Sequence, residues 1–309
     1  MQTIDRILVA LELDPMTQAL TPGSRRAADV GLALAPKIGA ETILFHSTAD
    51  DEHWDSDSGD YFVVPGGFAP EHRPALDAVL AEYRDAGLTV SLETPAEKAW
   101  VAITKRVMRD SIGLVICGKR NHPDAPGQRI GSVATKLVRK CPCAVWVAKA
   151  SSGPMPRRIV ASSDGGPVGA QVVAYAGFLA QQLAAQLHIV HAIQLPMSVQ
   201  MRPDPDDERA FEHRRCKEML DVFESQLKEA GYTGDAFFEM GITAPTTAIT
   251  RVVDGVHPDL VVMGTIARGG IAGVLVGNTA ERLLQRLDCS LLTVKPADFV
   301  CPVQPDERD

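Results

Sequence analysis

Two glycine-containing loops in this sequence have the residue types and spacing of phosphate-binding loops. Gly118 is followed thirteen residues later by the pair Gly131-Ser132. Gly264 is followed at the same distance by the pair Gly277-Asn278. Glycine lacks a Cβ, so backbone N–H groups can approach an anion closely. We expect the Ser and Asn of these pairs to cap helices, whose N-termini attract phosphate. Capped helix starts after glycine are common, so this signal alone is weak.

A carboxylate follows the first short apolar run in each half of the chain. Glu12 lies in the stretch Leu11-Glu12-Leu13-Asp14, and Asp164 lies in Ser163-Asp164-Gly165-Gly166. In open α/β sheets, ligands bind beyond the carboxyl ends of the strands, where the strand order reverses. The loop after the first strand and the loop after the fourth are therefore the candidate ligand-binding segments.

The chain repeats itself, which indicates two homologous domains. The run 114–118 (LVICG) matches 260–264 (LVVMG) at an offset of 146, and 6–9 (RILV) matches 158–161 (RIVA) at an offset of 152. Insertions in loops explain the drift between these offsets. The predicted organisation is domain 1 over 1–150, a linker over 151–156, domain 2 over 157–297 and a C-terminal tail over 298–309.

Each half alternates short apolar runs with segments of helical periodicity. Apolar runs of this length suit strands that are buried on both faces of a parallel sheet. Alternating strands and helices predict a doubly wound α/β fold with right-handed crossovers. In the first half the expected strands are 7–11, 42–45, 88–92, 114–117 and 144–148, and the expected helices are 24–38, 74–86, 96–109 and 132–139. Gly87 is placed to end the second of these helices.

Composition narrows the class of protein. The chain has 309 residues, a formal net charge of −8, 45% hydrophobic residues and 23% charged residues. These values are those of a globular protein, and the acidic balance argues against non-specific nucleic-acid binding. No stretch approaches the ~18 apolar residues of a membrane span, so we expect a cytoplasmic protein without a membrane partner. Six cysteines do not make a disulfide scaffold, and Cys117, Cys143 and Cys289 are expected to be buried thiols.

The glycine spacing resembles the G-x2-G-x9-G-[ST] signature of universal stress proteins. The matching segments are Gly264-x2-Ala267-x9-Gly277-Asn278 and Gly118-x2-Asn121-x9-Gly131-Ser132. A histidine after the second strand, at His46 and His191, extends the similarity. The run 270–281 is similar to the second half of tandem, two-domain members.

This resemblance implies a Rossmann-like domain with a five-stranded parallel sheet of order 3-2-1-4-5 in each half. The first strand then lies beside the fourth, so the two candidate loops meet. The resemblance also implies that the domains pack as a pseudo-dimer through the last strands, 145–147 and 291–294. A further homodimer of whole chains is left open.

Some family members bind ATP, and the resemblance assigns roles residue by residue. The acid after the first strand contacts adenine, the residue after the histidine lines the adenine pocket, and the glycine loop with the following hydroxyl holds ribose and phosphates. In domain 2 the corresponding residues are Asp164, Ala192, Met263, Gly264, Ala267, Arg268, Gly277, Asn278 and Thr279. In domain 1 they are Glu12, Ser47, Cys117, Gly118, Gly131 and Ser132.

Both halves depart from the signature. Asn121 and Ala267 replace its middle glycine, and Ala tolerates left-handed backbone angles less well than Asn. Asn278 lacks the hydroxyl, and Glu12 is one methylene longer than Asp. Domain 2 is the preferred site because it combines Asp164 with Arg268.

The predicted function is therefore regulatory binding under stress, with ATP (and magnesium) or another small ligand as the bound molecule. An alternative is an interaction module that binds no nucleotide. A slow ATP hydrolase, or an enzyme of the related alpha-hydrolase type, is less favoured because no catalytic base or elbow motif occurs. We predict no catalytic residue and no metal site.

Other polar segments have simpler interpretations. His188 and His191 are three apart on a predicted strand, so they point to opposite faces and do not share a metal. His191 is expected to be a hydrogen-bonded histidine at a strand end. The acidic stretch 50–57 is interpreted as a solvated loop, and 203–209 as part of the matching long connection in the second half.

Overall fold

The computed structural model describes residues 4–14, 16–49, 51–54, 61–64, 73–119, 131–201, 204–265, 283 and 286–304. The chain divides into two compact units. Domain 1 contains the chain up to Met155 together with the segment from Phe299, and domain 2 contains Pro156–Gly270 and Val276–Asp298.

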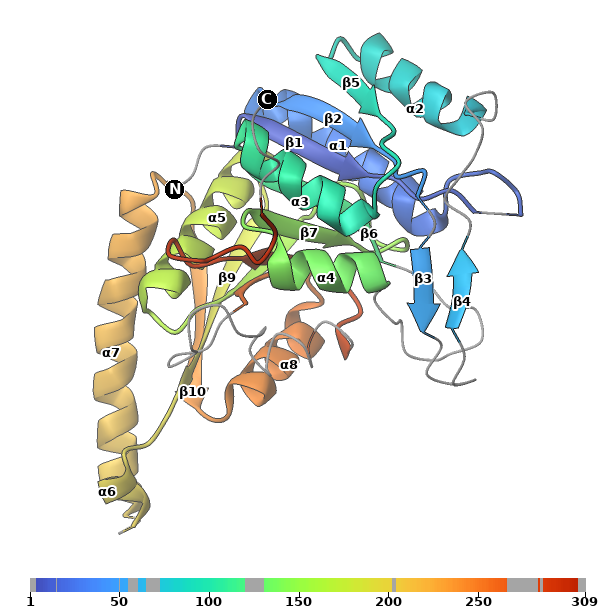
Figure 1. Cartoon of the computed structure of the whole chain (residues 1–309). Helices are drawn as coiled ribbons and strands as arrows, with labels where there is room; N and C mark the ends of the chain where they lie inside the picture. Colours follow the sequence, from blue (N-terminus) through green and yellow to red (C-terminus); the bar gives the residue numbers. More distant parts are fainter. Residues whose placement is uncertain are drawn as a thin grey trace. The chain divides into compact units, whose positions relative to one another are not determined.

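Domain 1 is a parallel sheet with helices on both faces (Figure 1). Its strand order is β5-β2-β1-β6-β7, which is the expected 3-2-1-4-5 when the inserted hairpin strands are left out. The strands are β1 (Arg6–Ala10), β2 (Glu41–Phe45), β5 (Val90–Glu93), β6 (Leu114–Gly118) and β7 (Ala144–Ala148). The helices are α1 (Pro22–Ile38), α2 (Pro74–Asp85), α3 (Ala99–Asp110) and α4 (Ser132–Lys140). The strand β7 is buried along its whole length, as both-face coverage requires.

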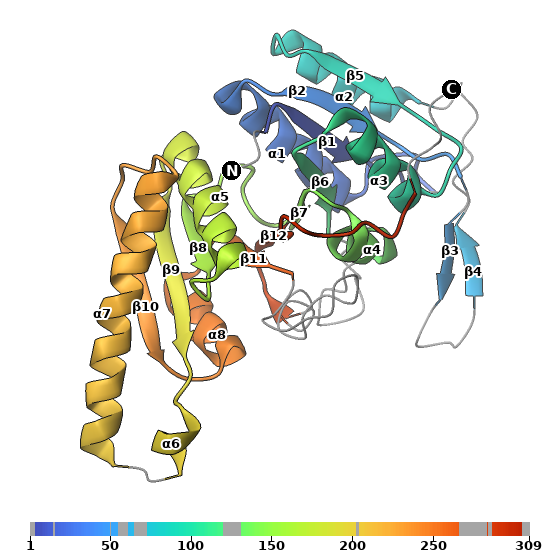
Figure 2. The same cartoon turned by 60° about the vertical axis from the view of Figure 1, so that its left-hand side comes forward.

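Domain 2 repeats this plan with the order β10-β9-β8-β11-β12, again 3-2-1-4-5 and parallel throughout. In Figure 2, α7 and α8 lie on opposite faces of its sheet. The strands are β8 (Arg158–Ser162), β9 (Gln186–Ile193), β10 (Ala236–Ile242), β11 (Leu260–Gly264) and β12 (Ser290–Val294). The helices are α5 (Pro167–Leu183), α6 (Met197–Gln200), α7 (Pro205–Glu229) and α8 (Pro245–Val256).

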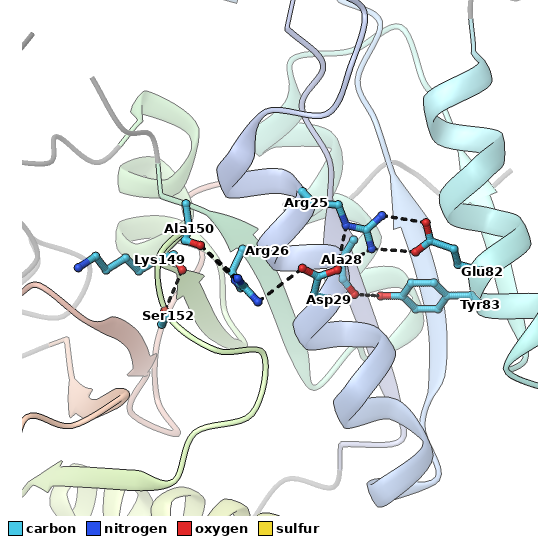
Figure 3. Close-up of polar contacts among 9 residues, drawn as sticks. All are labelled: Arg25, Arg26, Ala28, Asp29, Glu82, Tyr83, Lys149, Ala150 and Ser152. Carbon is cyan, nitrogen blue, oxygen red and sulfur yellow. Dashed lines mark hydrogen bonds and ion pairs between the residues drawn. The ribbon is translucent and has the colours of Figure 1, made fainter. Parts of the chain in front are cut away.

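Ion pairs fix α1 within domain 1 (Figure 3). Arg25 forms two hydrogen bonds with the Glu82 carboxylate of α2, at 3.1 and 2.9 Å, and also pairs with Asp29. Arg26 lies beside Asp29 and donates to the backbone oxygen of Ala150 at 3.3 Å. The first turns of α1 are thereby tied both to α2 and to the end of domain 1.

The interpretation of residues 50–57 as a solvated loop is wrong in part. Asp51–Trp54 forms the strand β3, which pairs antiparallel with β4 (Tyr61–Val64). The acidic composition gave no hint of this strand. Its pairing partner, YFVV, is rich in the β-branched and aromatic residues that favour strands.

The interpretation of residues 203–209 as part of a long connection is wrong from Pro205 onward. The helix α7 begins at Pro205, and the Asp204 side chain accepts a hydrogen bond from Asp206 N at 2.9 Å as its N-cap. Proline at the first position and carboxylates in the first turn are typical of helix starts. The acidic run therefore marks an N-terminus.

Most predicted boundaries in domain 1 lie within one or two residues of the observed ones. Gly87 follows the end of α2 with φ of +74°, as expected of a glycine that terminates a helix. The third strand is shifted, because it covers Val90–Glu93 where 88–92 was predicted. Asn278 and most of the helix that it was expected to cap lie outside the described residues.

Candidate functional site

The strand order places the switch point of domain 2 between β8 and β11. These strands are parallel neighbours, with Met263 in register with Ser162. Asp164 therefore lies just beyond the end of β8, next to the place where the chain leaves β11 at Gly264. On the other side of β8, Ser162 is in register with Val190, so Ala192 belongs to the same edge of the sheet. This is the edge at which doubly wound sheets bind ligands.

Asp164 is held in a tight turn at the start of α5. Its Oδ1 accepts a hydrogen bond from Gly166 N at 2.9 Å, and Ser163 Oγ accepts one from Gly165 N at 3.1 Å. Gly165 has φ of +76°, a conformation that suits glycine. The Asp164 side chain is exposed, so an oriented carboxylate faces solvent at the switch point.

Gly264 has a packing role that sequence reasoning missed. A Cβ at this position would lie 2.7 Å from Val168 Cγ1 on α5. The next residue, Thr265, is fully buried and donates its backbone N–H to Val294 O at 3.1 Å. The absence of a side chain therefore lets α5 approach the end of β11, whether or not an anion binds there.

The strand-end histidine of domain 2 links two of these segments. His191 Nδ1 lies 2.9 Å from Ser163 O, and the ring is 7% exposed. The ring packs in a T-shaped contact against Phe223 of α7, at 5.8 Å between centroids. The prediction that His191 is hydrogen-bonded is confirmed, but its place at a strand end is not, because β9 continues past it to Ile193. Met263 is buried near the end of β11, and Ala192 is half-buried near the end of β9, with β8 between these two strands.

The remaining residues predicted for domain 2 lie outside the described part of the chain. They are Ala267, Arg268, Gly277, Asn278 and Thr279. The four described residues of this set of nine, Asp164, Ala192, Met263 and Gly264, lie at the same edge of the sheet.

In domain 1 the corresponding edge brings Glu12, His46 and Cys117 together. Glu12 is half-buried, and its backbone N–H donates to Ser24 Oγ at 2.8 Å. Its carboxylate acts electrostatically on both His46 and Cys117. Ser47, next along the chain from His46, donates its hydroxyl to the backbone oxygen of Glu97 at 2.6 Å.

Burial controls the titration of two of these groups. It lowers the pKa of His46. The contact of Nδ1 with Leu11 O at 3.1 Å and the charge of Glu12 oppose this shift, and the charge of Arg73 reinforces it. Burial raises the pKa of Cys117 to about 12, with the charges of Cys141 and Glu12 acting in the same direction. A thiol that stays protonated at neutral pH is a poor nucleophile.

Gly118 has the same packing role as Gly264, with a tighter contact. A Cβ on Gly118 would lie 2.3 Å from the carbonyl carbon of Gly23 in α1, and one on Gly23 would lie 2.5 Å from Lys119 O. Two backbones therefore touch at this point. Gly23 was not singled out from the sequence, although its position at the start of the first helix was the available signal.

The prediction that Ser132 caps α4 is wrong. Gly131 occupies the N-cap position with φ of −58° and ψ of 155°, and Ser132 is the first helical residue. The Gly131 oxygen accepts the first helical hydrogen bond, from Thr135 N at 3.0 Å. Glycine is also acceptable at an N-cap, which is why the pair Gly-Ser left one residue of ambiguity.

Among the described residues, no group of three or more His, Cys, Asp or Glu side chains is arranged to hold a metal ion. His188 and His191 point to opposite faces of β9, since His188 stacks on Phe237 and His191 faces α7. Cys117, Cys143 and Cys289 are buried thiols, as predicted. None of the helices in the described ranges is long and apolar enough to cross a membrane.

The fold and the sheet edges define a class: two doubly wound α/β domains in tandem, each with a switch point between its first and fourth strands. Comparison with known proteins gives the family. A sequence model of the universal stress protein family matches residues 3–149 and again 155–295. The chain belongs to the universal stress protein family, as a tandem two-domain member.

Relatives of the same organisation support this assignment. Universal stress protein E of Photorhabdus laumondii is 22% identical over 72% of this chain and 74% of its own length. Universal stress protein E of Escherichia coli K12 is 24% identical over 74% of this chain and 75% of its own. A crystal structure assigned as a universal stress protein from Pseudomonas aeruginosa UCBPP-PA14 has a TM-score of 0.66, with 24% identity, and covers 96% of this chain and 95% of that chain. It has the same fold.

Proposed function

We propose that this protein is a stress-response regulator that binds an adenine nucleotide, or a similar small ligand, in at least one domain, with domain 2 as the preferred site. The observation that carries the proposal is the Asp164 carboxylate. It is exposed at the switch point of the sheet, and the hydrogen bond from Gly166 N to Oδ1 fixes its orientation. A carboxylate held in this way can accept a hydrogen bond from the amino group of an adenine.

The described residues fit the adenine end of such a ligand. Asp164 offers acceptor oxygens, and the half-buried Ala192 and buried Met263 supply apolar surface at the same edge. Arg268, Gly277 and Asn278 are proposed to hold the phosphates, with Mg²⁺ bound through the phosphates. When bound, ATP would supply charge and binding energy to a regulatory switch. No residue is proposed as a catalytic base.

Domain 1 is the weaker candidate. Its acid, Glu12, is half-buried and acts on His46 and Cys117, where Asp164 is exposed to solvent. Its Ser47 hydroxyl is engaged with the Glu97 backbone at 2.6 Å. A ligand there would have to compete with these internal interactions.

A second candidate function is an interaction module that binds no nucleotide. The packing roles of Gly118 and Gly264 favour it, because both glycines are required by the contact between the first helix and the fourth strand. These glycines would therefore be retained even in a protein that had lost its ligand.

Thermal unfolding with and without millimolar Mg-ATP tests the proposal. A ligand at about 100 times its Kd stabilises the folded protein by about 2.7 kcal/mol. Asp164→Asn is the informative variant, because its amide oxygen can still accept from Gly166 N while the negative charge is removed. Asp221→Ala, an exposed acid on α7, is the matched control. We expect the ligand-induced shift to fall in Asp164→Asn and in Gly277→Val, and to persist in Asp221→Ala.

Three results would redirect the proposal. A shift that persists in both site variants moves binding to domain 1. Equal loss in Asp164→Asn and Asp221→Ala indicates a general charge effect. No shift in the wild-type protein at any usable nucleotide concentration overturns nucleotide binding and favours the interaction module.

A further inference from the structure

The strand β10 is the outer strand of the domain 2 sheet, and within the described residues no strand pairs with its outer edge. The strand pairs with β9 over all seven of its residues and ends the strand order of this domain. Thr243 N donates to Ile193 O at 3.3 Å, so the alternation of a parallel ladder directs the odd-numbered residues of β10 toward β9. The N–H and C=O groups of the even-numbered residues then point outward: Ala236, Phe238, Met240 and Ile242.

One end of this edge is already capped. The Glu212 carboxylate of α7 accepts a hydrogen bond from Ile242 N at 3.2 Å, which agrees with the outward direction of that group. Three outward residues remain, with Phe238 in the middle. Within the described part of the chain, no acceptor is found for the N–H groups of Phe238 and Met240.

The side chains along β10 are largely apolar, and Glu239 is the strand's single charge. Phe237 is 48% exposed, and its ring stacks on His188 at 4.8 Å between centroids. Long apolar edge strands are templates for pairing with another strand unless charges, bulges or shortness protect them. The equivalent edge strand of domain 1, β5, is protected in this way: it has four residues, and its Glu93 pairs with Arg106 at 2.8 Å.

We propose that β10 is an interface between two copies of this chain, paired antiparallel about a two-fold axis with Phe238 opposite its own copy. An identical strand supplies the donors and acceptors that alternate residues require, and a two-fold contact closes without leaving a further edge. In this register Ala236 lies opposite Met240 of the partner subunit, so all three outward residues form hydrogen bonds. Glu239 lies opposite Phe237 of the partner subunit.

Other registers satisfy the edge less well. Centring the pair on Met240 would need the Ile242 N–H, which Glu212 already holds. Centring it on Glu239 would place two carboxylates directly opposite each other, which is destabilising. The cap at Ile242 and the charge at Glu239 therefore both select the register centred on Phe238.

Sedimentation velocity of the full chain over a concentration series tests the interface. Phe237→Glu places a glutamate opposite Glu239 of the partner subunit, twice per dimer. Each such pair is worth about 0.2–1 kcal/mol, so the dimer Kd should rise between about two-fold and about thirty-fold. Adding Glu239→Lys converts both repulsions into opposite-charge pairs and should restore the dimer. Ser91→Glu, an exposed position on β5, is the matched control and should leave the Kd unchanged.

The double variant makes the test specific to the register. Both variants lack the Phe237 ring, so they differ only in the charge that this register places opposite residue 237. Far-UV circular dichroism confirms that each variant is folded. A chain that remains monomeric at every concentration overturns the proposal, even if β10 accepts an extended peptide from another protein. A dimer that Phe237→Glu leaves unchanged, or that the second substitution does not restore, also overturns it.

Discussion

Replacing Gly264 by alanine should destabilise domain 2, although the local backbone can accept any residue. Gly264 is not among the described glycines with positive φ, so its backbone imposes no strain on alanine. At such a position Gly→Ala usually stabilises a protein by about 0.4–1 kcal/mol, because the unfolded chain loses freedom. Here the new Cβ would lie 2.7 Å from Val168 Cγ1, whereas carbon atoms in contact prefer about 3.5–4.0 Å.

The magnitude follows from the overlap of roughly 1 Å. Overpacking of this kind costs about 1–3 kcal/mol, which exceeds the gain from the unfolded state. Val168→Ala removes the clashing methyl group. Because Val168 is half-buried, that substitution alone should cost roughly 1 kcal/mol. The loss of unfolding free energy in the double variant should therefore be about 1–3 kcal/mol smaller than the summed losses of the two single variants.

Urea unfolding followed by far-UV circular dichroism measures these free energies, with all four proteins compared as a double-mutant cycle. A Gly264→Ala protein as stable as the wild type would refute the packing role, as would a coupling energy near zero. If Gly264 instead served close approach to an anion, the variant would keep its stability and lose only its response to Mg-ATP. Gly118→Ala should be more damaging and should have no such rescue, because its Cβ would meet the backbone of Gly23.

Two further predictions concern domain 1, whose unfolding the fluorescence of the buried Trp146 can follow. Tyr83→Phe should lower the free energy of unfolding by about 0.5–1.5 kcal/mol, because it removes the 2.6 Å hydrogen bond from the buried hydroxyl to Ala28 O; an unchanged urea midpoint would contradict this. Burial lowers the pKa of His46 in the folded state, so the unfolded chain binds the proton more tightly. Neutral His46 should make its full contribution to the free energy of unfolding above about pH 6.5, the pKa of histidine in the unfolded chain. This contribution should be lost as the pH falls through the pKa of His46 in the folded protein. His46→Gln should reduce the dependence of the unfolding free energy on pH in that acidic range. If the variant and the wild type show the same pH dependence, another group is responsible for it.

The order of elements could be predicted because each was encoded locally. The apolar runs of the strands and the tandem repeat needed no knowledge of distant contacts, and the strand order followed from the family resemblance. Gly87 likewise ends α2 by its own backbone preference. Some predictions failed because a partner outside the segment decided the outcome, and others misjudged a local helix start, at Ser132 and at Asp204. The strand β3 depends on β4, and the role of Gly118 depends on Gly23, almost a hundred residues earlier.

The candidate site was predictable to a similar extent. The convergence of Asp164 with the end of β11 follows from the strand order alone. The orientation of its carboxylate does not, because it depends on local contacts such as the hydrogen bond from Gly166 N. The acids of the two halves occupy corresponding positions, yet Glu12 is half-buried and Asp164 is exposed. Residue type and position predicted a site in each half with domain 2 preferred, but they did not predict how differently the two acids are buried.

The differences between the two halves have a pattern. Both domains have the same close contact between the first helix and the glycine at the end of the fourth strand. This glycine is Gly118 in domain 1 and Gly264 in domain 2. The domains differ in the length of the outer strand and in the charges on the first helix. The outer strand has four residues in β5 and seven in β10, and α1 carries the charges that clamp it while α5 has none. Once a fold is duplicated, one copy can keep a protected edge while the other becomes available for binding. The exposed acid and the long outer strand of domain 2 are the reasons why we propose both ligand binding and self-association for this half of the chain.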